Sequence, residues 1–273
     1  MPLETIILEV AGVRSPVRTG GPSTSREAVV FLHGNPGSGE DWEELGSAVS
    51  QFARVIAPDM PGFGRAGKPD DFRYTVPGYA EHLGALLERL EVSRAHLVMH
   101  DFGGPWGLQW AVRHGDAVAS VTLINAGVFV GYRWHWAARL WRTPLLGELS
   151  MATATRWSFG MGLRDLPAPF VDRMWRDFDP ATRRAVLRLY RATDIDTVAR
   201  EHAPALRALN LPALVVWGQR DPFITPDFAE QQKQVFPRAQ IVMLEHCGHW
   251  PFANDPGAVA APVVKFLKEQ VGS

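Results

Sequence analysis

Short apolar segments alternate with amphipathic segments along most of this chain. Strand–helix alternation of this kind predicts a mostly parallel sheet covered by helices on both faces. The apolar runs have the length and composition of strands buried on both faces, and they are Ala28–His33, Arg54–Pro58, His96–Met99, Val118–Ile124, Ala213–Trp217 and Ile241–Leu244. The helical patterns are Asp41–Phe52, Val76–Leu90, Gly104–His114, Pro226–Val235 and Gly257–Val271. An N-terminal hairpin would add two further strands, Thr5–Val10 and Arg14–Val17.

The alternation stops between about residues 127 and 210, where the sequence has helical patterns interrupted by prolines and no strand pattern. A structureless loop of this length is uncommon inside a compact domain. We therefore predict an α/β core formed by residues 1–127 and 211–273, with residues 128–210 inserted as a helical cap. Right-handed crossovers would place the functional loops of such a core at the carboxyl ends of its strands.

The amino-acid composition excludes fewer functions than the alternation of apolar and amphipathic segments does. The formal net charge of −1 gives no electrostatic argument for nucleic acid or for an anionic membrane as a partner. The single cysteine, Cys247, excludes an intramolecular disulfide, and neither a CxxC nor an HExxH metal motif is present. The chain shows no signal-peptide pattern and no apolar stretch long enough to cross a bilayer. We expect a cytoplasmic protein that is a monomer or a homodimer.

Four polar residues stand directly after predicted strands, in the order Asn35, Asp101, Asp221 and His249. Taken singly, each has an ordinary structural explanation, such as a turn residue or a helix cap. The order aspartate, acid, histidine on successive loops of a parallel sheet is the chain order of a nucleophile–acid–histidine triad. Asp101 also ends an apolar strand and precedes two glycines and a helix, which is the outline of a nucleophile elbow.

The whole chain resembles the α/β-hydrolase superfamily, and in particular its aspartate-nucleophile branch of epoxide hydrolases and haloalkane dehalogenases. The resemblance rests on the motifs HGNP, HDFGG, WGQRDPF and GHW. It implies that Asp101 is the nucleophile, that His249 is the base, and that Asp221 orients the imidazole. It also implies an eight-stranded sheet, an oxyanion hole formed by the backbone N–H groups of Asn35 and Phe102, and no metal or organic cofactor. Some dehalogenases keep their acid where this chain has Asn125, but an amide cannot serve as one.

The residues do not agree on whether the leaving group is the alkoxide of an epoxide or a halide. Tyr190 is placed like a cap tyrosine that protonates the alkoxide in epoxide hydrolases, and His100 also resembles that family. Asn35 matches an amide that binds halide in many dehalogenases, and Met99 points the same way, but Phe102 stands where dehalogenases place a halide-binding tryptophan. We favour an epoxide hydrolase that forms vicinal diols, with haloalkane dehalogenase as the alternative. A different hydrolase or a non-catalytic binding protein is a weaker possibility.

The predicted cap is rich in aromatic residues, since five of the ten tryptophans fall within residues 128–210. This cluster predicts an apolar substrate that is bulky or aromatic. The resemblance implies that the substrate is a small electrophile and that water is the second reactant. We expect the substrate to contact His33, Trp134, Trp141, Trp157 and Trp250.

Overall fold

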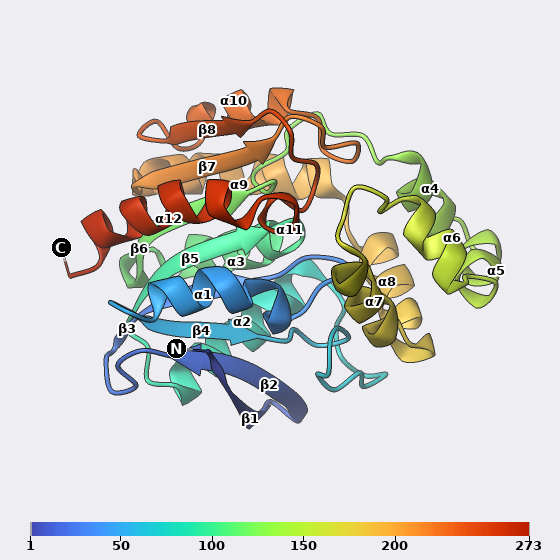
Figure 1. The fold of residues 1–273 in the computed structure, drawn as a ribbon, viewed down its shortest axis with the longest axis horizontal. Coiled ribbons are helices and arrows are strands. Elements are labelled where there is room, and N and C mark those ends of the chain that lie inside the picture. The colour runs from blue at the N-terminus through green and yellow to red at the C-terminus, as the bar shows by residue number, and fades with distance from the viewer. Residues whose placement is uncertain (1, 273) are drawn as a thin grey trace.

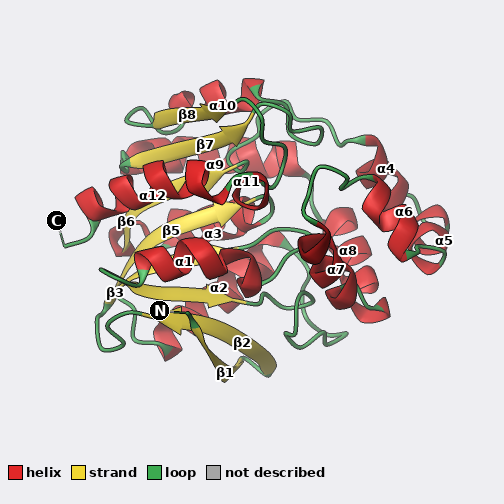
Figure 2. Ribbon diagram, in the orientation of Figure 1, coloured by secondary structure: helices red, strands yellow, loops and turns green. Residues whose placement is uncertain are grey.

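An eight-stranded sheet runs through the molecule in the order β1-β2-β4-β3-β5-β6-β7-β8 (Figures 1 and 2). We use a computed structural model, which describes residues 2–272. The strands are β1 (Glu4–Val10), β2 (Val13–Gly20), β3 (Glu27–Leu32), β4 (Arg54–Pro58), β5 (Arg94–His100), β6 (Val118–Ile124), β7 (Ala213–Gly218) and β8 (Gln240–Leu244). β2 pairs antiparallel with β1 and β4, and the other pairs are parallel. The predicted α/β-hydrolase architecture is confirmed.

Helices cover both faces of this sheet, as the alternation predicted. The helices of the core are α1 (Glu43–Val49), α2 (Val76–Arg89), α3 (Gly103–Arg113), α10 (Asp227–Gln231), α11 (Pro251–Asn254) and α12 (Pro256–Gln270). Figure 1 shows α1 and α12 in front of the sheet, with α2 and α3 behind it. Two clusters of buried apolar side chains fill the two layers. The central strands are buried on both faces because helices cover both, whereas β8 is half-buried because it lies at the sheet edge.

Six helices separate β6 from β7, where the sequence predicted a helical insertion. They are α4 (Trp136–Arg142), α5 (Leu146–Ala152), α6 (Arg156–Met161), α7 (Ala168–Asp177), α8 (Pro180–Ala192) and α9 (Ile195–Leu209). The first five lie beyond the carboxyl ends of the strands, and we call them the cap (Figure 2). The last, α9, packs against α3 of the core. The division of the chain at residues 127 and 210 therefore stays a prediction. Among residues 2–272, no helix is long and apolar enough to cross a membrane.

Candidate active site

Asp101 stands on a sharp turn between β5 and α3. Its φ of +48° is in the left-handed region, which only a tightly constrained turn imposes on a residue other than glycine. Two neighbouring glycines make the turn possible. A Cβ on Gly34 would lie 2.3 Å from the Cβ of Asp101, and one on Gly103 would lie 2.3 Å from the carbonyl oxygen of Leu32. The turn thus has the geometry expected of a nucleophile elbow.

His249 links Asp101 to Asp221. Its Nδ1 lies 2.7 Å from Oδ2 of Asp221, and its Nε2 lies 3.4 Å from Oδ2 of Asp101. All three groups come from loops at the carboxyl ends of β5, β7 and β8. The structure therefore brings together the three residues that the sequence singled out, in the arrangement of nucleophile, base and orienting acid.

Asp221 is held by more than the imidazole. Its Oδ1 accepts hydrogen bonds from the backbone N–H groups of Phe223 at 2.7 Å and Ile224 at 2.9 Å. Its Oδ2 also accepts a hydrogen bond from Nδ2 of Asn125 at 2.7 Å. These bonds fix a carboxylate whose side chain is fully buried. Asn125 follows β6, and the sequence did not reveal that it supports Asp221 in this way.

The charges of the triad shift one another's pKa values. Burial lowers the pKa of His249, but Asp221 and Asp101 outweigh it and raise the pKa to about 10. Burial raises the pKa of Asp101, but the hydrogen bond and charge of His249 outweigh it and hold that pKa below its usual value. The resting site at neutral pH therefore contains an ionised Asp101 beside a protonated His249.

Asn35 contacts the other carboxylate oxygen of Asp101. Its backbone N–H donates to Oδ1 of Asp101 at 2.7 Å, and its side-chain Nδ2 donates to the hydroxyl oxygen of Tyr190 at 3.3 Å. Among residues 2–272, no acceptor is found for the hydrogen of this hydroxyl. Burial, with the charge of Asp101 adding to it, raises the pKa of Tyr190 well above its usual value. Tyr190 is therefore a neutral phenol with a hydrogen to donate.

A cavity opens between the cap and these residues. It is lined by Asp101, Phe102, Pro105, Phe129, Tyr132, Trp134, His135, Tyr190, Ile195, Phe223 and Ile224. Its lining is mainly apolar, in agreement with the predicted apolar substrate. The cavity is narrow, however, with a volume of about 30 Å³. Because small-molecule sites are usually several times larger, a bulky substrate needs the cap side chains to move apart.

Two polar residues between β6 and α4 lie on this cavity wall and were not chosen from the sequence as site residues. Tyr132 donates its hydroxyl hydrogen to the carbonyl oxygen of Phe223 at 3.1 Å. His135 accepts a hydrogen bond from the backbone N–H of Ala138 at 3.3 Å through Nδ1. Since burial lowers the pKa of His135 to about 4, its ring is neutral and the hydrogen is on Nε2. The only signal in the sequence was the unusual run of aromatic residues from 132 to 136.

The other predicted contact residues lie in different places. Trp134 lines the cavity, and Trp141 packs against the ring of Tyr190 with the centroids 5.0 Å apart. Trp250 packs against the imidazole of His249, with the ring centroids 4.6 Å apart, and does not line the cavity. Trp157 is 73% exposed on α6, away from the cavity. The sequence could not separate these tryptophans, because short amphipathic helices do not reveal which face meets the core.

His33 is also absent from the cavity lining. It is fully buried, with Nδ1 2.8 Å from the carbonyl oxygen of Gly34 and Nε2 accepting from the backbone N–H of Met60 at 3.0 Å. These two bonds hold the loop that carries Asn35. No cluster of three or more histidine, cysteine, aspartate or glutamate side chains suited to a metal ion occurs among residues 2–272.

The fold and this site define an α/β hydrolase, and comparison with known proteins agrees. The model of the alpha/beta hydrolase fold family matches residues 27–256, and the chain belongs to this family.

Particular relatives differ in the reactions for which they are named. The cis-3-alkyl-4-alkyloxetan-2-one decarboxylase of Xanthomonas campestris pv. campestris is 29% identical over 276 residues, covering 92% of this chain and 90% of the relative. A haloalkane dehalogenase of Bradyrhizobium diazoefficiens is also 29% identical over 276 residues, covering 88% of this chain and 86% of the relative. The solved structure of the epoxide hydrolase CorEH superimposes with a TM-score of 0.82 at 19% identity, covering 98% of this chain and 99% of that chain, and this likeness concerns the fold.

Proposed function

We propose that this protein hydrolyses apolar epoxides to vicinal diols through a covalent ester on Asp101. The observation that supports this most is the position of Tyr190, which lines the same cavity as Asp101 and has no acceptor for its hydroxyl hydrogen among residues 2–272. An epoxide leaves as an alkoxide and needs a proton donor, which a halide does not. Relatives named for both reactions are similar to the chain, so the choice has to come from the cavity itself.

In the first step, Asp101 attacks a ring carbon of the epoxide. Its Oδ1 is held by the backbone N–H of Asn35, so Oδ2 is the oxygen that forms the new bond. As the C–O bond of the ring breaks, the ring oxygen takes the hydrogen of Tyr190. The products are a hydroxyalkyl ester of Asp101 and a tyrosinate.

Esterification then turns His249 from an acid into a base. The pKa of His249 is high because two carboxylates face it. The ester removes the negative charge of Asp101, which lowers that pKa. The proton of His249 returns Tyr190 to its neutral form, and this leaves a neutral imidazole held in one tautomer by Asp221.

In the second step, His249 takes a proton from water and the hydroxide adds to the ester carbonyl carbon. The negative charge develops on Oδ1, where the N–H of Asn35 already lies. The amide N–H of Phe102, at the start of α3, is the second donor that we assign to this oxyanion. As the intermediate collapses, the diol alkoxide takes the proton from His249 and leaves. The acid proton that remains on Asp101 then passes to His249, which restores the carboxylate beside a protonated imidazole.

The proposal is tested by supplying purified protein with styrene oxide and with 1-bromohexane, and measuring diol and bromide separately. We expect diol, with an added mass on the peptide containing Asp101 when hydrolysis is slowed by His249→Gln. Bromide release without diol would refute the epoxide proposal. Absence of any adduct with either compound would refute covalent catalysis and favour a binding protein.

Haloalkane hydrolysis is a second candidate because of Asn35. Its Oδ1 is buried without a hydrogen-bond partner. If the amide were reversed, Tyr190 would donate to Oδ1 and the amide N–H groups would be free to bind an anion. The side chain of Phe102 is a phenyl ring without a donor. The second side-chain donor to a halide would then be His135, just before α4, which has an N–H on the cavity wall.

The oxetan-2-one ring in the name of the Xanthomonas relative is another strained cyclic oxygen electrophile. A cis-3,4-dialkyloxetan-2-one therefore belongs in the same substrate panel. If the protein formed an alkene from this oxetan-2-one and no diol from the epoxide, the proposed substrate would change from an epoxide to an oxetan-2-one.

A further inference from the structure

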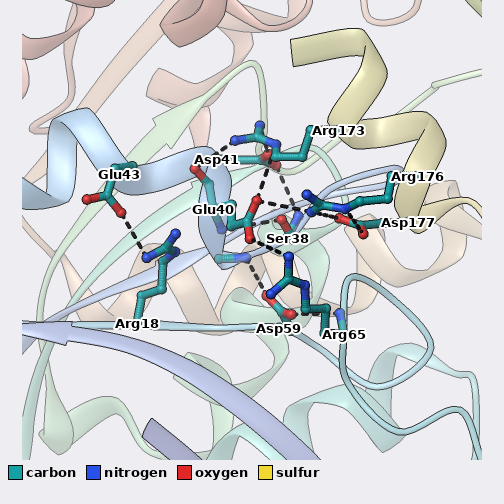
Figure 3. Close-up of polar contacts among 11 residues, drawn as sticks. Arg18, Ser38, Glu40, Asp41, Glu43, Asp59, Arg65, Arg173, Arg176 and Asp177 are labelled. Carbon is teal, nitrogen blue, oxygen red and sulfur yellow. Dashed lines mark hydrogen bonds and ion pairs between the residues drawn. The ribbon is translucent and has the colours of Figure 1, made fainter. Parts of the chain in front are cut away.

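A buried carboxylate outside the triad joins the cap to the core (Figure 3). Asp41 belongs to a short 3-10 helix, Gly39–Trp42, and its side chain is 2% exposed. Its Oδ1 accepts a hydrogen bond from Nη2 of Arg173, on cap helix α7, at 2.6 Å. Nη1 of Arg173 also donates to the carbonyl oxygen of Glu40 at 3.0 Å. One arginine of the cap thus holds two consecutive residues of the core.

The other oxygen of Asp41 faces the loop that carries Asn35. It accepts a hydrogen bond from the backbone N–H of Ser38, three residues after Asn35, at 3.2 Å. The loop passes close to this oxygen, because a Cβ on Gly37 would lie 2.6 Å from it. A second buried carboxylate, Asp59, accepts from the N–H of Gly39 at 2.7 Å. Backbone N–H groups of the loop are therefore fixed by buried charges.

The charge of Asp41 depends on its arginine partner. Burial raises the pKa of Asp41 to about 7, and Arg173 and the N–H of Ser38 act against that rise. The charged groups of the surrounding network are Glu40, Asp59, Arg65, Arg173, Arg176 and Asp177, and Figure 3 shows how they lie. Without the guanidinium, a buried carboxylate would be unpaired and would take up a proton.

We propose that Arg173 is a positioning residue which, through Asp41, holds the loop of Asn35 so that its N–H meets the oxyanion of Asp101. Docking of the cap and positioning of the Asn35 loop are then coupled, because the same carboxylate bonds to the cap arginine and to the N–H of Ser38 in that loop. The positioning itself is a property of the resting protein, and only its effect on turnover rests on the proposed function.

The chain offers a matched control on the same helix. Arg176 lies three residues after Arg173 and bonds to Glu40 and Asp177, but not to Asp41. Arg173→Met and Arg176→Met remove the same charge from α7, and only the first leaves Asp41 unpaired. Arg173→Lys keeps the charge and one hydrogen bond.

The first measurement is hydrogen exchange of the peptide spanning residues 34–42 in the resting protein, which requires no substrate. We expect Arg173→Met to speed exchange of the Ser38 and Gly39 amides about tenfold, with Arg173→Lys intermediate and Arg176→Met close to wild type. Asp41→Asn should reproduce the effect, and Arg173→Met combined with it should add little more. Equal exchange in the Arg173 and Arg176 variants would overturn the proposal, as would full additivity with Asp41→Asn.

The second measurement separates the two steps of turnover. Arg173→Met should slow hydrolysis of the Asp101 ester about tenfold, because the oxyanion forms in that step, and should slow ester formation less. Equal slowing of both steps would overturn the positioning role. If no substrate is turned over but exchange responds as expected, the proposed function fails and the positioning role stands. If Arg173→Met does not fold, Arg173→Lys and Asp41→Asn give the same comparison against Arg176→Met.

Discussion

Replacing Tyr190 with phenylalanine removes the one hydroxyl of the cavity whose hydrogen is uncommitted. If Tyr190 protonates the alkoxide, opening of the epoxide should slow by roughly 10²–10⁴-fold, the usual contribution of a general acid. This range corresponds to about 3–5 kcal/mol in the activation free energy. Bromide displacement needs no proton donor, so its rate should change by less than about tenfold.

The same substitution has a smaller effect on folding. The hydroxyl of Tyr190 accepts one hydrogen bond from Nδ2 of Asn35, at 3.3 Å. Loss of a neutral hydrogen bond of this kind costs about 1 kcal/mol of the free energy of unfolding. The loss of activity would therefore exceed anything that lowered stability could explain.

Tyr132→Phe is the matched control, because it removes the same atom from the same cavity. The hydroxyl of Tyr132 already donates its hydrogen to the carbonyl oxygen of Phe223. We expect a similar loss of stability, also about 1 kcal/mol, with less than about tenfold loss of epoxide opening. Single-turnover stopped flow with an aryl epoxide gives the opening rate, and denaturant unfolding gives the stability.

Two results would refute this reasoning. If Tyr132→Phe slowed epoxide opening as much as Tyr190→Phe, loss of the uncommitted hydrogen of Tyr190 would not explain the slower opening. If Tyr190→Phe slowed bromide release and epoxide opening equally, the hydroxyl would act in binding or packing and not as an acid.

Three further predictions concern the triad and its turn. His249→Gln should allow ester formation and block hydrolysis, so mass spectrometry of the Asp101 peptide should show a stable adduct; an unmodified peptide with normal turnover would contradict this. Because the folded pKa of His249 is about 10 and its unfolded value is about 6.5, its charge stabilises the fold fully below pH 6.5 and less as pH rises toward 10. The difference in Tm between wild type and His249→Gln should shrink over that range, and a constant difference would show that the charge is not responsible. Gly34→Ala should abolish ester formation and lower Tm, because its Cβ would lie 2.3 Å from the Cβ of Asp101; an active, stable variant would contradict the described turn.

Much of the architecture could be predicted because it is local. The apolar runs that we predicted as strands coincide with β3 to β8, and the hairpin is formed by β1 and β2. The predicted ends of the helices were less accurate than the predicted strands. The pattern over Asp41–Phe52 is divided into the 3-10 helix Gly39–Trp42 and α1, and the pattern after Pro226 is divided into α10 and a 3-10 turn. Periodicity marks which segments are helical but not where their hydrogen bonds change register.

The sequence by itself determined which polar residues of the core meet at the ends of the strands. Asp101, Asp221 and His249 each follow a strand, and parallel strands bring their carboxyl ends to one edge, so chain order was enough to predict that they meet. The tertiary structure alone decided what surrounds them. Tyr132 and His135 enter the cavity while Trp157 faces outward, and Arg173 reaches Asp41 from a segment 132 residues away. These contacts depend on how short cap helices pack against the core, and neither local hydrogen bonding nor hydrophobic periodicity encodes that packing.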